Sequence, residues 1–314
     1  MLFSVLIANY NNSRFLDAAL KSVYQQTYSN WEVVLVDDGS TDEFERVIKA
    51  YSDDPRIKVF RNGNNKGCAY TKRKLAANAA GDILAFLDPD DELHADALKI
   101  MVRAHRERPD CSIIHSTHYV CDQFMNIEKI SEKPKALPEN TPYLFLSDGS
   151  IHAFATFKRS SYDKTAGMEP IREHDKAVDQ DLYYILEEAG NVLFINIPLY
   201  YYRIHNGSIS NWGQEGAAMK EHFSIIEKAC LRRMEKLHDI KTEAAQEWFR
   251  KYRTRYYKIR ILNSFRRRAW FRFAGSVMVF PFIGGADNIV SYCRKLPKEG
   301  FSLLRKSFVE SYRH

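Results

Sequence analysis

The sequence has no apolar run long enough to cross a membrane as a helix, which takes about 18 residues or more. The longest candidate, Phe273 to Gly285, is interrupted by glycine and proline. The first residues, Met1 to Ile7, have no charged start and no cleavage site, so they are more typical of a buried strand than of an export signal. We therefore expect no membrane-spanning helix and a cytoplasmic location.

Cysteine is scarce and shows no pattern. The five cysteines are odd in number, widely spaced and without a C-x-x-C pair: Cys68, Cys111, Cys121, Cys230 and Cys293. A disulfide framework or a zinc ribbon needs paired, closely spaced cysteines, so neither is indicated. A reducing compartment is the natural interpretation.

Motifs of several enzyme classes are also missing. No G-x-G-x-x-G follows a strand-like segment and no G-x-x-x-x-G-K-[ST] occurs, which disfavours a nicotinamide dehydrogenase and a P-loop enzyme. The absence of a G-x-S-x-G elbow disfavours a serine hydrolase.

Charge is unevenly distributed along the 314 residues. From Lys241 onward there are 17 Lys and Arg against 5 Asp and Glu, a balance of +12, although the whole chain has a net charge of only +6. The preceding residues therefore have a net charge of −6. An acidic body is suited to a cation, and a basic tail to an anionic partner.

The first hundred residues alternate between strand-like and helix-like segments. Continuous apolar runs predict strands buried on both faces, and apolar residues at helical spacing predict helices. The expected strands are Phe3 to Ile7, Glu32 to Val36, Ile57 to Phe60 and Asp82 to Leu87, and the expected helices are Leu16 to Thr27, Asp42 to Tyr51, Gly67 to Ala80 and Leu93 to Ala104. This alternation predicts an α/β fold with a doubly wound, mostly parallel sheet and helices on both faces.

The rest of the chain is predicted to complete this domain and to add a helical extension. Strand-like pieces at 111–119, 153–157, 192–197 and 199–204 flank a helix at about 176–190, and helices are expected at 213–238 and 243–262. We expect one domain over residues 1–212, with halves at about 1–110 and 111–212, and a basic extension over 213–314.

Two aspartate clusters directly follow expected strands. The segment from Asp88 to Asp91 follows one strand, and Asp37 and Asp38 follow another. Ligands of doubly wound sheets bind at the carboxyl ends of the strands, and like charges there repel unless a cation lies between them. A divalent metal, Mn²⁺ or Mg²⁺, is therefore predicted. The alternative is a solvated acidic turn, with Asp91 as an acid at the start of the next helix.

Hydroxyl and amide side chains near these strand ends suggest helix caps. Ser40 or Thr41 is expected to cap the helix that follows, while Asp38 points to the sheet edge. Asn12 and Ser13 are in position to cap the first helix.

Five segments occur in the order and spacing of one enzyme family. They are Ser4 to Asn11, Gln25 to Tyr28, Val36 to Ser40, Asn65 to Gly67 and Phe86 to Asp91. Over about residues 1–210 the chain thus resembles the family 2 glycosyltransferases of the GT-A fold. The resemblance implies inverting transfer from a nucleoside diphosphate sugar, usually a UDP-sugar, in a bacterial surface-polysaccharide pathway. The Q-x-x-R-W segment of processive membrane synthases is missing, which favours addition of one sugar or a few.

The resemblance implies roles for donor-binding residues. Tyr10 and Asp38 would contact the nucleobase, Asp88 would face the ribose, and Asp90 would bind the metal on the diphosphate.

The chain departs from the family pattern at two places. Ala8 stands where many relatives have Thr, which removes one possible contact to the base. Lys72 and Arg73 stand where Arg-Asn is common, so the donor contacts there are in question.

The segment from Ala177 to Leu182 resembles the E-D-x-D-L helix start of the family, in the A-V-D-x-D form of chondroitin- and hyaluronan-type synthases. It implies that Asp179 is the general base, which takes the proton of the acceptor hydroxyl. Asp181 is a weaker acceptor-side candidate, because an acid there is also favourable at a helix N-terminus. The alternative is that both aspartates are only N-terminal helix acids.

Tyr202 to Ser208 resembles the Y-R-x-H-x-x-S segment of the family, in which the histidine reaches the metal or the diphosphate. His205 is therefore a second candidate metal ligand, and a structural hydrogen bond is the alternative. His152 and His174 are weaker candidates for the acceptor side.

The basic tail interleaves cations with aromatic residues, in Arg250 to Arg260 and in Arg266 to Phe273. Such stripes bind nucleic acid or an anionic membrane surface, and a solvated helical face is the simplest alternative. Because acceptors of this family are often lipid-linked, we predict peripheral docking at the inner face of the cytoplasmic membrane and no nucleic acid partner.

The predicted activity is metal-assisted single displacement onto a saccharide or lipid-linked acceptor. A sugar nucleotidyltransferase is one alternative, but it should have a Gly-rich first loop where this chain has Asn9 to Asn12. A catalytically inactive membrane-surface scaffold is the other, and it has no need of the retained aspartates.

Overall fold

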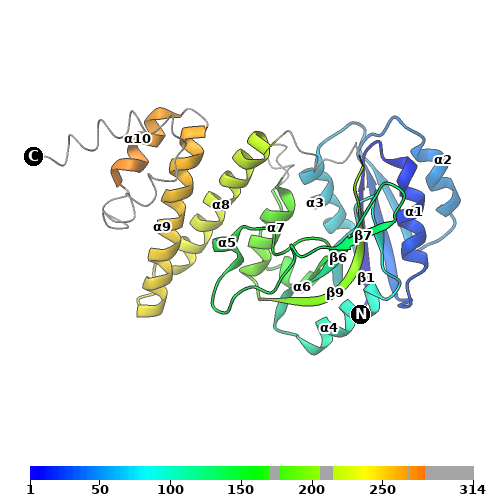
Figure 1. Ribbon diagram of the computed structural model, residues 1–314, viewed down its shortest axis with the longest axis horizontal. Coiled ribbons are helices and arrows are strands. Elements are labelled where there is room, and N and C mark those ends of the chain that lie inside the picture. Colours follow the sequence, from blue (N-terminus) through cyan, green and yellow to red (C-terminus); the bar gives the residue numbers. More distant parts are fainter. Residues whose placement is uncertain (170–176, 206–214, 267–268, 280–314) are drawn as a thin grey trace, which may run out of the picture. The chain divides into compact units, whose positions relative to one another are not determined.

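A computed structural model describes residues 1–169, 177–205, 215–266 and 269–279 (Figure 1). The chain divides into two compact units, Met1–Ile225 and Ile226–His314. The boundary predicted at 212/213 and His174 both lie outside the described residues.

The first half of the sheet is parallel, as the apolar runs predict. Its strands are, in spatial order, β3 (Ile57–Arg61), β2 (Trp31–Asp37), β1 (Phe3–Asn9) and β4 (Ile83–Phe86). In β1, Val5 lies between Val33 and Ala85 of the neighbouring strands. All residues of β2 and nearly all of β1 are buried, because helices cover both faces.

The second half of the sheet mixes directions. Its strands are β8 (Ala155–Lys158), β6 (Cys111–Cys121), β9 (Asn191–Arg203) and β5 (Glu92–Leu93), and β7 (Ile127–Ile130) pairs with β6 outside this path. The two strands expected at 192–197 and 199–204 form the single strand β9. Its register with β6 shifts just before Pro198, where an irregularity accommodates a residue that has no N–H to donate.

Helices surround this sheet. They are α1 (Ser13–Tyr24), α2 (Phe44–Ile48), α3 (Cys68–Asn78), α4 (Ala97–Glu107), α5 (Tyr143–Leu146), α6 (Arg159–Tyr162) and α7 (Val178–Glu187), with a 3₁₀ turn, η1 (Lys49–Tyr51), after α2. Figure 1 shows α1 and α2 on one side of the parallel strands and α3 and α7 on the other. The doubly wound α/β architecture is confirmed.

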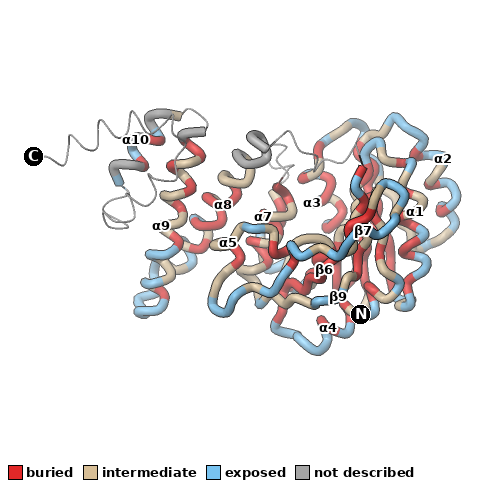
Figure 2. Tube along the Cα trace, viewed as in Figure 1, coloured by how far each residue is buried: buried red, intermediate tan, exposed pale blue. Residues whose placement is uncertain are grey.

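The core lies between the strands and the inward faces of these helices (Figure 2). In α1, Leu16, Leu20 and Val23 are completely buried at helical spacing. A Leu→Ala change at such a position costs roughly 2–5 kcal/mol of stability. This rigid frame fixes where the strands end, and with them the loops of the candidate site.

Two expected helix caps are not formed. No side chain of Ser40 or Thr41 caps α2, which begins only at Phe44. Instead the Ser40 hydroxyl donates to Asp37 Oδ1 at 2.5 Å, because that carboxylate is nearer than the helix. The first N–H of α1, that of Ser13, donates to Asp42 Oδ2 at 2.9 Å, so this cap comes from a distant loop and not from the Asn12 side chain.

Asp91 does not start a helix. The next element is β5, and α4 begins at Ala97, so Leu93 belongs to a strand as well. Asp91 is buried and accepts hydrogen bonds from Tyr200 Oη (2.8 Å) and from the backbone N–H of Arg203 (2.7 Å). The prediction failed because both partners are more than a hundred residues away.

The second unit is helical in its described part. It contains the end of α8 (Glu215–Leu237), α9 (Glu243–Arg266) and α10 (Trp270–Val279), as the sequence predicts for the first two. The buried Glu227 carboxylate accepts hydrogen bonds from Asn263 and Arg272. Among the described residues, no helix has the length and apolar character needed to cross a membrane.

Candidate functional site

The loops after β1 and β2 are joined at their strand ends. Asn9 Nδ2 donates to Asp37 Oδ1 at 2.9 Å, and the backbone N–H of Asp38 donates to the carbonyl of Asn9 at 2.8 Å. Tyr10 follows immediately, and its side chain is 48% exposed. An exposed aromatic ring on an anchored loop is available to stack on a flat ligand such as a nucleobase.

Asp38 is buried and anchors a turn. Its Oδ1 accepts from Asn62 Nδ2 (2.7 Å) and from the backbone N–H of Lys66 (2.8 Å), and its Oδ2 accepts from the N–H of Gly67 (2.9 Å). Gly67 has φ +97°, a conformation that favours glycine, at the start of α3. Since a carboxylate has about four acceptor positions, Asp38 keeps about one for a ligand.

The loop after β4 brings three carboxylates together. Restricted access of water raises the pKa of Asp88 to about 6; the cation of Lys72 opposes this rise, and the charges of Asp90 and Asp179 add to it. Burial, together with the charges of Asp88 and Asp90, raises the pKa of Asp91 well above its usual value. The carboxylates are thus close enough to disfavour one another's ionisation, which a cation bound among them would relieve.

Asp90 is paired with His205. Nε2 of His205 lies 2.9 Å from Asp90 Oδ2, and Nδ1 lies 3.1 Å from the guanidinium of Arg14. Because a guanidinium has only donors, Nδ1 must accept, so Nε2 holds the proton and donates it to Asp90. The ring also packs on Phe15, with centroids 4.8 Å apart.

The residues present fit a divalent metal that shares its coordination with a phosphate ligand. Among residues 1–169, 177–205, 215–266 and 269–279, no three His, Cys, Asp or Glu side chains are grouped as a metal site. Mg²⁺, however, commonly takes one or two carboxylates and completes its shell with water and phosphates. Asp90 is suited to this role. His205, with its Nε2 proton, is placed to orient Asp90, and it could ligate the metal only if Arg14 released Nδ1.

Asp179 lies in the first turn of α7 and is held by a lysine. Lys72 Nζ of α3 is 2.5 Å from Asp179 Oδ1 and 4.8 Å from the ring centroid of Phe86. Burial alone would lower the pKa of Lys72, but the charges of Asp179, Cys68 and Asp88 outweigh it and raise that pKa above its usual range. One buried cation therefore connects the carboxylate of α7 with the loop after β4.

The acceptor-side candidates lie in different settings. Asp181 is buried in the first turn of α7. His152 is half-buried, with its ring 5.0 Å from that of His118 and 5.8 Å from that of Tyr202. Burial lowers the pKa of His152 to about 3, helped by His118 and Lys133 and opposed by Asp179.

Sequence reasoning missed several residues of this site. Lys72 was noted only as a departure from the family pattern, and Arg14, Tyr200 and Arg203 were given no role. The sequence does contain a signal for Lys72: it occupies the buried face of α3 with Ala69 and the other buried residues of that helix. A lysine on such a face is almost never buried unless paired.

Comparison with known proteins agrees with this geometry. The profile of the family described as glycosyl transferase family 2 matches residues 4–165. An uncharacterized glycosyltransferase of Nostoc sp. is 29% identical over 216 residues, covering 66% of each chain. Glycosyltransferase GlyG of Streptococcus pneumoniae is 26% identical over 222 residues, covering 66% of this chain and 72% of that one. The chondroitin synthase of Escherichia coli is 27% identical over 232 residues, which is 74% of this chain but only 33% of that enzyme.

Solved structures show the same fold at low identity. TarS of S. aureus (residues 1–349) in complex with UDP-GlcNAc has a TM-score of 0.66 and 16% identity, covering 89% of this chain and 80% of that one. The mannosyltransferase PcManGT of Pyrobaculum calidifontis, in complex with GDP-Man and Mn²⁺, has a TM-score of 0.54 and 13% identity. The match covers 99% of this chain and 80% of that one. The family profile matches more than half of this chain, and the chain has the GT-A architecture. The chain therefore belongs to the family 2 glycosyltransferases.

Proposed function

We propose that the chain transfers a sugar from a nucleoside diphosphate sugar, a UDP-sugar, to a saccharide or lipid-linked acceptor with inversion. The observation that supports this most is the Lys72 bridge, which connects the aspartate loop after β4 with Asp179 on α7. This bond supports the proposal because one cation lies close to the carboxylates proposed for the donor side and for the acceptor side.

On the donor side, Tyr10 and the remaining acceptor position of Asp38 are proposed to contact the nucleobase, and Asp88 the ribose. Asp90 is proposed to hold Mn²⁺ or Mg²⁺, with His205 orienting it. When bound, the metal would neutralise charge that develops on the leaving diphosphate. The complexes of TarS with UDP-GlcNAc and of PcManGT with GDP-Man and Mn²⁺ support this choice of donor and metal.

On the acceptor side, Asp179 is proposed as the general base. Its side chain is 47% exposed, so an acceptor hydroxyl can reach the carboxylate. The hydroxyl proton passes to Asp179 as the acceptor oxygen bonds to the anomeric carbon. The bond from that carbon to the diphosphate breaks on the opposite face, and the nucleoside diphosphate leaves with the electron pair.

Relatives with polysaccharide-synthase names, such as chondroitin synthase, support a place in cell-surface polysaccharide biosynthesis. Peripheral binding to an anionic membrane through α9 is part of the proposal. Arg250 and Lys251 are exposed there, and Lys251 also pairs with Glu247 and lies over the ring of Trp248. Arg253 and Arg260 lie over Phe249 and Tyr256 of the same helix.

The activity is tested by incubating the full chain with Mn²⁺ and a panel of UDP-, GDP- and dTDP-sugars and measuring release of the nucleoside diphosphate, with and without saccharide acceptors. Asp90→Asn and Asp179→Asn are expected to reduce release strongly. Asp110→Asn, an exposed carboxylate paired with Arg108, serves as the matched control. No release from any donor, or equal release by all variants, would refute the proposal.

A further inference from the structure

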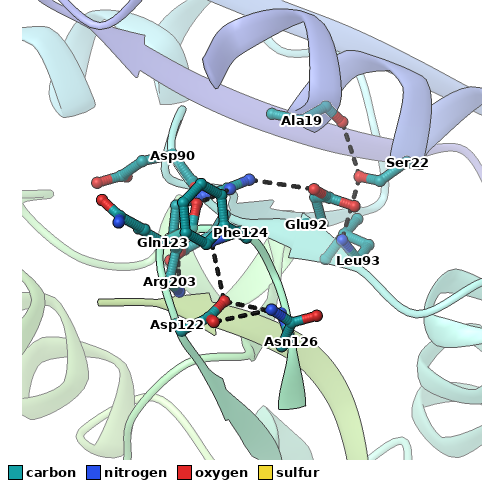
Figure 3. A network of polar contacts seen from close by, with 11 residues as sticks. Ala19, Ser22, Asp90, Glu92, Leu93, Asp122, Gln123, Phe124, Asn126 and Arg203 are labelled. Atoms are coloured by element: carbon teal, nitrogen blue, oxygen red, sulfur yellow. Dashed lines mark hydrogen bonds and ion pairs between the residues drawn. The ribbon is translucent and has the colours of Figure 1, made fainter. Parts of the chain in front are cut away.

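Arg203 joins three segments that are distant in the sequence. It is the last residue of β9, and its side chain is only 6% exposed. Its Nε donates to the carbonyl of Asp90 (2.6 Å), its Nη1 to the carbonyl of Gln123 (2.9 Å) and its Nη2 to Glu92 Oε1 (3.1 Å), as Figure 3 shows around the guanidinium.

We propose that Arg203 is a positioning residue that ties the aspartate loop, residues 88–91, to the hairpin turn at residues 122–126, so that metal affinity at Asp90 depends on that turn. This inference rests on the proposed metal-binding role of Asp90. Arg203 itself is expected to touch neither metal nor donor, because its buried donors are already directed at protein acceptors.

The contacts fix the backbone immediately after the Asp90 side chain. The guanidinium holds the carbonyl of Asp90, and the N–H of Arg203 holds Asp91 Oδ1 at 2.7 Å. The guanidinium also lies 4.6 Å from the ring centroid of Phe15 on α1, which fixes its plane. A rotation of the loop would break buried hydrogen bonds to a charged group, so the direction of the Asp90 side chain is set by this clamp.

The hairpin turn is held by the half-buried carboxylate of Asp122 in addition to its backbone hydrogen bonds. Asp122 accepts from the backbone N–H groups of Phe124 (2.8 Å) and Asn126 (2.9 Å) and from Asn126 Nδ2 (2.8 Å), which fixes the intervening carbonyl of Gln123 that Arg203 reaches (Figure 3). Phe124 at the tip is 76% exposed. Loosening this turn is therefore expected to loosen Arg203, and with it Asp90, without altering any residue of the site.

The test compares Mn²⁺ affinity in the presence of UDP, measured as free Mn²⁺ by electron paramagnetic resonance, for full-length variants. Loss of a residue that orients a metal ligand typically weakens metal binding by about 10- to 100-fold, which is the effect expected for Arg203→Gln. Asp122→Ala is expected to weaken it by roughly threefold or more, since the turn keeps part of its geometry.

Asp110→Ala is the matched control. Asp110 lies directly before β6, whereas Asp122 lies directly after it. Asp110 is an exposed carboxylate that accepts hydrogen bonds from Arg108 and Asn191. Its variant should keep the wild-type affinity. Should Arg203→Gln fail to fold, Asp122→Ala still decides, because its side chain lies in an exposed turn.

Two results would count against the inference and are distinguishable. If the wild type binds Mn²⁺ and Asp122→Ala binds it as tightly as Asp110→Ala does, the coupling through Arg203 is refuted and the proposed function stands. If the wild type binds no Mn²⁺ with UDP, both the inference and the proposed metal site are refuted.

Discussion

Replacing Lys72 with methionine removes the buried cation that holds Asp179. The contact of 2.5 Å is a charge-assisted hydrogen bond, a class that contributes roughly 1.5–3 kcal/mol. Because the Asp179 side chain is 47% exposed, water replaces part of the contact, and we take the lower part of that range. Because Lys72 orients Asp179 toward the acceptor, we expect its loss to lower kcat roughly 10- to 30-fold, the factor to which about 1.5–2 kcal/mol corresponds.

The assay is the rate of nucleoside diphosphate release at saturating donor, with urea unfolding in parallel. Methionine is apolar and of similar length, so it can occupy the buried position of the Lys72 side chain beside Phe86. The free energy of unfolding should therefore change by less than about 1.5 kcal/mol. Lys72→Arg keeps the charge and should retain most of the activity. Lys74→Met is the control, because Lys74 lies on the same helix and its ammonium donates to the carbonyl of Arg61 and to Asn62 Oδ1.

A double-mutant cycle of Lys72 and Asp179 shows whether the lysine acts through the carboxylate. If Lys72 acts through Asp179, then Lys72→Met should cost little more in an Asp179→Asn background, where the carboxylate is already gone. A Lys72→Met enzyme with wild-type kcat would refute the proposed role. The role would also be refuted if the double variant lost as much activity as the two single losses combined.

Three other expectations concern stability and membrane binding. Burial lowers the pKa of His105 to about 3 and that of His115 to about 4. Below about pH 6.5 the unfolded chain therefore binds more protons than the folded chain, so each histidine should lower the free energy of unfolding by up to about 2 kcal/mol at pH 5. Equal urea midpoints at about pH 7.5 and pH 5 would contradict this. Asp38→Ala leaves two backbone N–H groups without their acceptor and should lower the free energy of unfolding by about 3 kcal/mol, whereas a change under about 1 kcal/mol would show that the turn does not depend on it. Reversing both exposed charges, Arg250→Glu with Lys251→Glu, should weaken sedimentation with phosphatidylglycerol vesicles at least about tenfold, and unchanged sedimentation would exclude α9 as the membrane contact.

Much of the fold follows from local patterns in the sequence. The runs that became β1 and β2 are continuous apolar segments, which only a strand covered on both faces can bury, and the helical spacing of Leu16 and Leu20 places α1 correctly. The two-residue strand β5 is too short for any periodic pattern, so its residues were assigned to the helix that begins at Ala97.

The candidate site was predictable only where its chemistry lies within one segment. Asp88 and Asp90 could be singled out because they follow a strand end. The pairings of Lys72 with Asp179 and of Arg203 with the carbonyl of Asp90 could not be predicted, because each spans more than a hundred residues of sequence. Local propensity has no information on such pairings, and only a cation on a buried helix face indicates that a partner must exist.

The central claim, a metal-assisted donor site built on Asp90 and separate from the base Asp179, is tested most directly by calorimetric titration of UDP with and without Mn²⁺. We predict that Mn²⁺ increases the affinity of the wild type for UDP. Asp90→Asn should abolish this increase in affinity, and Asp179→Asn should retain it. Binding that Mn²⁺ does not strengthen, or a gain that survives in Asp90→Asn, would contradict it.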